Sequence, residues 1–266
     1  MSKRQKRLLW LLGIVAIGSF VTSVARIGGW RAASAPPPAP PPVKQRVYVR
    51  AGAVWPQLRR NLDVLGDRLK KPGKEQLFLA GVLTRSGEDH VAPINLTLEP
   101  GQRLSLSIAG GPPQLVSVHS TRAPSSSLSE RDRDLVEALL FDSAESFFLG
   151  QAAGAQTRFL GSQFQLDEPE YSNRRFDLYA VTSTNEADSQ RVDGSKTYYF
   201  DSDSGLLEMV RYQIQRAGIP VSIQITLRNW ETESGETVAR RIDRRENGAP
   251  VWSLTVNSAM VGRSND

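Results

Sequence analysis

The feature that most constrains the fold is a succession of strand-like runs joined by tight turns. In residues 103–109, Leu104, Leu106 and Ile108 alternate with serines, as expected for a strand that buries one face. Asn247-Gly248 stands between two such runs and is a strong hairpin signal. Strands joined by such short turns pair antiparallel, because parallel pairing needs a longer crossover. The sequence therefore predicts a mainly antiparallel sheet.

Two amphipathic helices are expected besides these runs. One, over Gln57–Leu69, precedes the first strand, and the other, over Ser129–Leu149, follows the fourth strand. The order predicted is one helix, four strands, one helix and seven strands, an α+β fold with about eleven strands. A single continuous sheet is favoured, because the Ser-rich link and second helix are too short to form an independent unit. The predicted strands are Leu77–Thr84, Val91–Leu98, Arg103–Ala109, Gln114–Ser120, Arg158–Leu166, Arg174–Thr182, Lys196–Asp201, Leu206–Gln213, Pro220–Asn229, Thr237–Arg245 and Val251–Val261.

The N-terminal residues carry an export pattern. Lys3, Arg4, Lys6 and Arg7 precede an uncharged apolar run over residues 8–25. Such a run fits either a cleaved signal peptide or a single span in the inner membrane, and both alternatives stay open. We assign residues 1–35 to a signal peptide or N-terminal membrane anchor and residues 36–45 to a Pro-rich linker. Residues 46–263 are then a single extracytoplasmic domain.

The charge balance argues against nucleic-acid binding. The chain has 33 Lys and Arg residues against 28 Asp and Glu residues, a net charge of +5. Residues 1–35 hold 6 of the basic residues and no acidic one, so the remainder has 27 against 28, a net charge of −1. The positive excess therefore belongs to the export segment, and no nucleic-acid partner is expected.

The sequence offers little chemistry for catalysis. It has no Cys and only two histidines, His90 and His119, each placed alone in a strand pattern. No HExxH, GxSxG, SxxK, P-loop or GxGxxG spacing occurs. We therefore expect no enzyme, no catalytic residue, no metal and no cofactor.

Two charged motifs have structural interpretations. The run Asp201-Ser202-Asp203-Ser204-Gly205 resembles the start of a calcium loop, but Tyr212 stands where the twelfth-position Glu would be needed. A tight turn is the favoured interpretation. The arginines of residues 240–245 alternate between the two faces of a strand, with acidic residues nearby at 231–236. We expect a solvated, charge-paired sheet face there.

One longer motif carries a family resemblance. Residues 196–212 read Lys-Thr-Tyr-Tyr-Phe-Asp-Ser-Asp-Ser-Gly-Leu-Leu-Glu-Met-Val-Arg-Tyr, and Trp230 is followed by Gly-Glu-Thr-Val at 235–238. Together with the element order over residues 55–262, this resembles the LolA/LolB-type periplasmic lipoprotein-carrier superfamily. The resemblance implies that residues 46–263 form one curved half-barrel with a helical lid. It also implies an apolar cavity between the sheet and the helices.

The cavity would be lined by apolar side chains of the inward sheet face and the lid. A sheet too wide for its own side chains leaves a ligand-sized space, whereas ordinary core packing is the simpler alternative for each residue. The candidate liners are Leu104, Leu106, Ile108, Leu139, Phe147, Phe148, Ile223, Ile225, Trp252 and Leu254.

Two functions follow from these expectations. The first is a non-enzymatic envelope protein that binds a lipid, lipoprotein acyl chains or another apolar ligand in the half-barrel. The second is a membrane-tethered interaction or regulatory module of a bacterial secretion or envelope-stress system, with an envelope protein as its partner. Retention of residues 8–25 in the inner membrane would favour the second, because a tethered protein cannot carry cargo by diffusion.

Overall fold

The computed structural model describes residues 47–48, 56–69, 75–99, 103–117, 129–152, 156–182 and 195–263. All of them belong to the second of two compact units, Pro42–Asp266. The predicted export segment and the whole predicted linker therefore lie outside the described residues. Within the described part of the chain, no helix is both long enough and apolar enough to cross a bilayer.

In the described part of the chain, twelve strands form one antiparallel sheet with the order β1-β6-β7-β8-β9-β10-β11-β12-β2-β3-β4-β5. The strands are β1 (Val47–Tyr48), β2 (Glu75–Arg85), β3 (Val91–Glu99), β4 (Arg103–Ile108), β5 (Gln114–Ser117), β6 (Gln156–Phe164), β7 (Phe176–Thr182), β8 (Ser195–Asp201), β9 (Leu207–Arg216), β10 (Ile219–Glu233), β11 (Glu236–Glu246) and β12 (Ala249–Arg263). Eleven of them are the predicted strands, and β1 is a two-residue addition beside β6.

The two groups of strands are joined through β12 and β2. These strands pair from Trp252–Arg85 to Arg263–Glu75, with a register shift between Val256 and Ser258. The C-terminal strand thus closes the gap between two meanders that are far apart in sequence. This confirms the expectation of one continuous sheet.

Within the described residues, three α-helices and one short 3-10 helix accompany the sheet. They are α2 (Pro56–Leu65), α3 (Glu130–Phe141), α4 (Ala144–Ala152) and η1 (Pro169–Tyr171). The predicted first helix extended to Leu69, but it ends four residues earlier, because Gly66 adopts a φ of 118° that a helix does not tolerate.

The prediction of one helix over Ser129–Leu149 is wrong in one respect, because this range contains two helices, α3 and α4. The chain leaves the helical conformation at Asp142, which has a φ of −119° and caps the end of α3. The hydroxyl of Ser143 then accepts from the backbone N–H of Ser146 and begins α4. Sequence periodicity did not reveal this break, because apolar residues continue on both sides of it.

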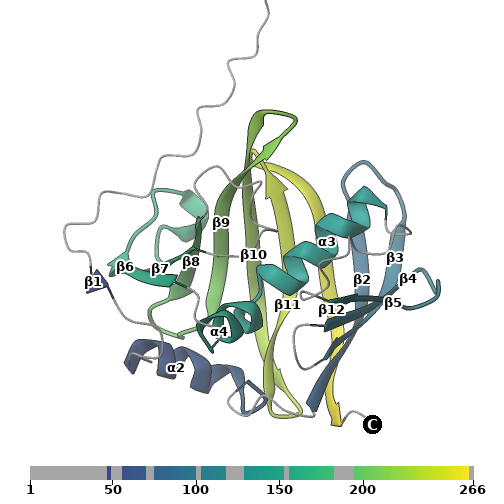
Figure 1. Cartoon of the computed structure of the whole chain (residues 1–266), viewed down its shortest axis with the longest axis horizontal. Coiled ribbons are helices and arrows are strands. Elements are labelled where there is room, and N and C mark those ends of the chain that lie inside the picture. Colours follow the sequence, from purple (N-terminus) through teal and green to yellow (C-terminus); the bar gives the residue numbers. More distant parts are fainter. Residues whose placement is uncertain are drawn as a thin grey trace, which may run out of the picture. The chain divides into compact units, whose positions relative to one another are not determined.

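One face of the sheet, which we call the inner face, packs against α3 and α4. It is defined by alternating buried residues such as Leu104, Leu106, Ile223, Ile225 and Leu254. These side chains share one apolar cluster with residues of all three α-helices. Figure 1 shows the curved sheet with α3 and α4 across one of its faces, which confirms a half-barrel with a helical lid. We use "lid" below for α3 and α4 together.

The opposite, outer face is largely polar but carries a second apolar cluster behind β6–β9. Tyr171 of η1 packs there against Phe176 and Leu178 of β7. Strand β7 is therefore covered on both faces, which explains why Phe176–Ala180 are all buried and do not alternate.

Candidate functional site

The structure brings all ten candidate residues into the apolar cluster between the inner face and the lid. Eight are buried, and Ile108 and Phe148 are partly buried at its edge. The sheet residues meet because positions of one parity on neighbouring strands face the same side. For example, Leu104 and Leu106 are opposite Leu98 and Leu96 on β3. Leu139 of α3 and Phe147 of α4 belong to the same cluster from the side of the lid.

An aromatic cluster that sequence reasoning missed surrounds Phe147. The centroid of its ring lies 4.9 Å from that of Tyr198, 5.0 Å from that of Phe200 and 5.8 Å from that of Tyr179. Such tilted and edge-to-face pairs add about 0.5–1.5 kcal/mol each beyond the burial of their area. The sequence signal that could have revealed this cluster is the Tyr-Tyr-Phe run in β8, because alternation along the strand places Tyr198 and Phe200 on the inner face. This end of the lid is therefore fixed by packing.

A buried ion pair fixes the junction between α3 and α4. The Lys196 ammonium on β8 donates to the Asp142 carboxylate, and both side chains are at most 5% exposed. Lys196 also donates to the Phe141 carbonyl at 3.0 Å, and the Tyr212 hydroxyl donates to Asp142 at 2.8 Å. The carboxylate that ends α3 thus also attaches the lid to β8 and β9.

A second buried charge attaches the first turns of α3 to the sheet. The Arg244 side chain on β11 is 2% exposed and donates to Glu246 at 2.9 Å and to the Asp134 carbonyl at 3.2 Å. The sequence predicted a solvated face for residues 240–245, and this is wrong for Arg244, because α3 covers it. Arg240 is paired with Glu231 and Glu233, as predicted for that face.

A third charged cluster joins α2, α4 and the β10–β11 hairpin. The Arg68 guanidinium donates to both carboxylate oxygens of Glu145, each at 2.9 Å. The Arg68 backbone N–H donates to Glu236 at 2.9 Å. Burial raises the pKa of Glu236, although Arg68 acts to lower it. This cluster therefore adds a further charged attachment of the lid.

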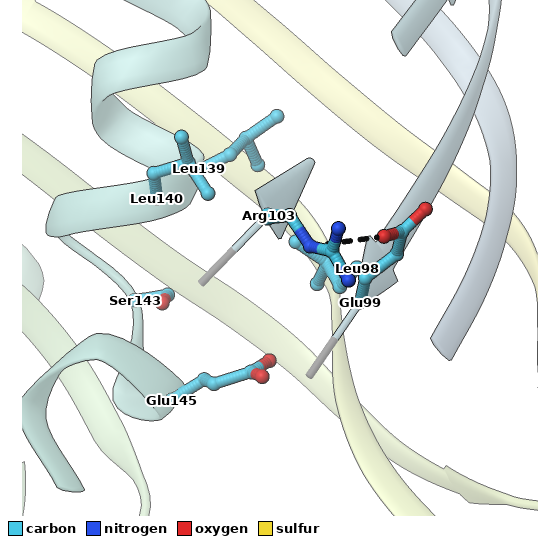
Figure 2. A pocket seen from close by; sticks show the side chains of 7 residues that line it. All are labelled: Leu98, Glu99, Arg103, Leu139, Leu140, Ser143 and Glu145. Atoms are coloured by element: carbon cyan, nitrogen blue, oxygen red, sulfur yellow. Dashed lines mark ion pairs between the residues drawn. The ribbon is translucent and has the colours of Figure 1, made fainter. Parts of the chain in front are cut away.

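The space beneath the middle of the lid is very small. Figure 2 shows Leu139, Leu140, Ser143 and Glu145 of the lid region beside the Glu99–Arg103 ion pair, whose N–O distance is 3.3 Å. The cavity that they line with Leu98 has a volume of about 10 Å³, enough for one water molecule. An acyl chain could enter here only if lid side chains moved.

A larger hollow lies beside the first turns of α3. It has a volume of about 240 Å³ and is lined by Arg85, Ser86, Asp134, Pro250, Val251 and Trp252. Trp252 is the one candidate residue that lines it. Because Trp252 also belongs to the apolar cluster, the hollow adjoins that cluster near the start of β12.

The remaining predicted motifs are structural. Asp201 accepts hydrogen bonds from the backbone N–H groups of Asp203 and Ser204, which confirms the turn. Asn247 and Gly248 both have positive φ angles, as the predicted hairpin requires. His90 lies exposed in the turn before β3, and His119 lies outside the described residues. Among the described residues, no group of three or more His, Cys, Asp or Glu side chains could hold a metal ion.

The comparisons with known proteins find similarity only among solved structures. No family model matches the sequence, and no curated protein matches it. A LolA superfamily protein from Nitrosomonas europaea is 11% identical with a TM-score of 0.48, over 82% of this chain and 94% of that chain. A putative outer membrane lipoprotein-sorting protein domain from Vibrio parahaemolyticus is 10% identical with a TM-score of 0.46, over 79% and 92%.

A DUF1329 family protein from Desulfovibrio piger is 10% identical with a TM-score of 0.42, over 79% of this chain and 90% of that chain. These likenesses are of structure, at 10–11% sequence identity.

Proposed function

We propose that this chain is a non-enzymatic extracytoplasmic protein that binds an acyl chain, from a lipid or a lipoprotein, between the inner face and the lid. One observation carries the proposal: a single apolar cluster spans the inner face of an open sheet and reaches partly exposed residues at its edge. Ile108 and Phe148 lie at that edge. The basic and apolar N-terminal residues support an extracytoplasmic location.

Binding at this site requires the lid to move. The inner face is filled by lid side chains, and the cavity beside Leu139 holds about 10 Å³. Among the described residues, no backbone hydrogen bond joins the lid to a strand, so a ligand can replace the apolar contacts of the lid without breaking a strand ladder. Acyl methylenes would then replace the side chains that leave, at roughly 0.8 kcal/mol for each buried methylene. We expect slow association, because binding depends on a conformational change.

The filled inner face also favours a second candidate function. In an interaction or regulatory module, the lid and sheet would form a permanent core and a partner would bind elsewhere. The small cavity beside Leu139 is the observation that favours it. The two functions differ in whether an acyl probe enters the half-barrel.

A titration of the full-length protein with a fluorescent twelve-carbon acyl probe tests the proposal. Phe148→Arg places a charge at the partly buried edge of the site and should weaken binding about tenfold or more, because the charge loses hydration when the ligand covers it. Met260→Arg makes the same change on the outer face, where Met260 is 60% exposed, and should bind within twofold of the unmodified protein.

Saturable binding that only Phe148→Arg weakens supports the acyl-binding function. Absence of binding to the unmodified protein would reject it in favour of the interaction module. Equal weakening by both substitutions would show that the probe binds a general surface instead of the half-barrel.

A further inference from the structure

A buried hydrogen-bond donor belongs to one of the residues that line the hollow at the start of β12. The Trp252 side chain is 4% exposed and lines this hollow. Its indole Nε1 is shielded from solvent and finds no hydrogen-bond partner among the described residues. A buried donor without an acceptor is destabilising, because it has lost its hydration without a replacement. A ligand that brings an acceptor to this position would recover that cost.

The neighbours of Trp252 define what kind of acceptor fits. Trp252 is directly opposite Arg244 on β11 and Arg85 on β2, so the three side chains form a row across the sheet. Arg244 is paired with Asp134 and Glu246. Arg85 is paired with Asp132 and Glu88. Both guanidinium groups are therefore already neutralised.

The charge count around the hollow disfavours an anionic ligand. Arg85, Arg244 and Arg216 face four carboxylates, those of Glu88, Asp132, Asp134 and Glu246. An added carboxylate or phosphate would meet an excess of negative charge in a partly buried place. A neutral group that accepts a hydrogen bond meets no such penalty.

The size and position of the hollow agree with the head of an acyl chain. At about 240 Å³, the hollow is far larger than the cavity of about 10 Å³ beside Leu139, which holds one water molecule. Beyond Trp252, the same face of β12 continues with the buried residues Leu254 and Val256. A chain that starts in the hollow would therefore extend along the apolar inner face.

We infer that this hollow binds the neutral carbonyl of an acyl ester or amide, with Trp252 Nε1 as the donor. Asp134 lines the same hollow and belongs to α3, so the inference includes a shift of this end of α3 that gives the carbonyl access to the buried indole Nε1. The inference rests on the proposed acyl-binding function and narrows its ligand to neutral carbonyl-bearing chains over free fatty acids.

The test compares three probes of equal chain length on the full-length, ¹⁵N-labelled protein. They are 1-lauroylglycerol, its carbonyl-free ether analogue 1-dodecylglycerol, and laurate. The indole N–H resonance of Trp252 is identified by its loss in Trp252→Phe, and that of Trp230 by its loss in Trp230→Phe. Trp230 is a matched control, because its Nε1 is also buried without a partner but it does not line the hollow.

We expect the ester to bind about threefold to tenfold more tightly than the ether, the effect of one neutral hydrogen bond. Laurate should bind more weakly than the ester. The Trp252 indole proton should move downfield with the ester only, and the Trp230 proton should stay in place. Trp252→Phe should remove the difference between ester and ether.

Two different negative results separate failure of this inference from failure of the proposed acyl-binding function. Equal binding of ester and ether with an unmoved Trp252 resonance would overturn this inference and leave the proposed function standing. Failure of both neutral probes to bind would overturn the inference and the proposed function together. If Trp252→Phe does not fold, the difference in affinity between the ester and the ether on the unmodified protein still tests the inference.

Discussion

Glu236 is the residue whose ionisation should most directly affect stability. It is 5% exposed, and burial raises its pKa despite the nearby Arg68 guanidinium. Glu145 and Glu75 add negative charge that acts in the same direction as burial. The cluster thus holds more carboxylates than the single guanidinium can neutralise.

The pH dependence follows from the direction of this shift. A carboxyl group whose pKa is higher in the folded protein stabilises the fold fully below its unfolded pKa of about 4.3, and this contribution is lost as the pH rises through the folded pKa. Glu236→Gln keeps an oxygen for the Arg68 backbone N–H and cannot ionise. We expect its free energy of unfolding, relative to the unmodified protein, to rise between about pH 4 and pH 8.

Urea denaturation of both proteins across this pH range measures that difference. Glu231→Gln is the control, because Glu231 is 63% exposed and belongs to the outer charge pairs. A difference that stays constant with pH would contradict the assigned direction of the Glu236 shift.

For several single residues, the sequence was sufficient to predict which face of the sheet the side chain occupies. Alternation alone identified Leu104, Leu106, Ile223, Ile225 and Leu254 as inward-facing, because a strand with one buried face repeats every two residues. It failed for Arg244, because the covering helix comes from residues about 110 positions earlier in the chain. A charged residue in a strand carries no local sign that a helix will bury it.

At the scale of elements, the lid depends on the Lys196–Asp142 pair. Lys196→Met should cost about 3–5 kcal/mol of unfolding free energy, because it leaves the buried Asp142 carboxylate without its cation. Adding Asp142→Asn should recover much of that loss, because the remaining neutral amide can still accept from the Tyr212 hydroxyl.

A double-mutant cycle in urea, built from Lys196→Met, Asp142→Asn and the double variant, measures the coupling between the two side chains. We expect the double variant to be clearly more stable than the sum of the single losses implies. Additive losses would show that the pair does not hold the α3–α4 junction to the sheet.

The break between α3 and α4 shows the limit of periodicity at this scale. A helix was predicted across Asp142 because Leu139, Leu140, Phe147 and Phe148 continue an apolar face. The break depends on a partner on β8, more than fifty residues later in the chain. Local patterns cannot contain that information.

At the scale of the whole molecule, the sheet depends on the contact between β2 and β12. A Cβ atom at Gly81 would lie 2.2 Å from the Thr255 carbonyl oxygen, far closer than atoms can approach. Gly81→Ala must therefore push β12 away from β2 near the register shift at Val256. We expect a loss of more than about 2 kcal/mol of unfolding free energy.

Thermal and urea unfolding compare this variant with Gly87→Ala. Gly87 has free space around it and a φ of 80°, so the strain of its backbone alone should cost about 1 kcal/mol. The continuous sheet also predicts one cooperative transition for the unmodified protein. Equal losses in the two variants would contradict the role of Gly81 in joining the two meanders.

Photo-crosslinking tests directly whether an acyl chain binds between the inner face and the lid. The full-length protein is irradiated with a lauroylglycerol that carries a diazirine near the end of its chain. Mass spectrometry of the digested protein then locates the attachment sites. We expect attachment to inner-face residues of β4, β10 or β12 and to α3 or α4. Attachment confined to outer-face positions such as Met260, or no attachment that unlabelled lauroylglycerol can compete away, would contradict it.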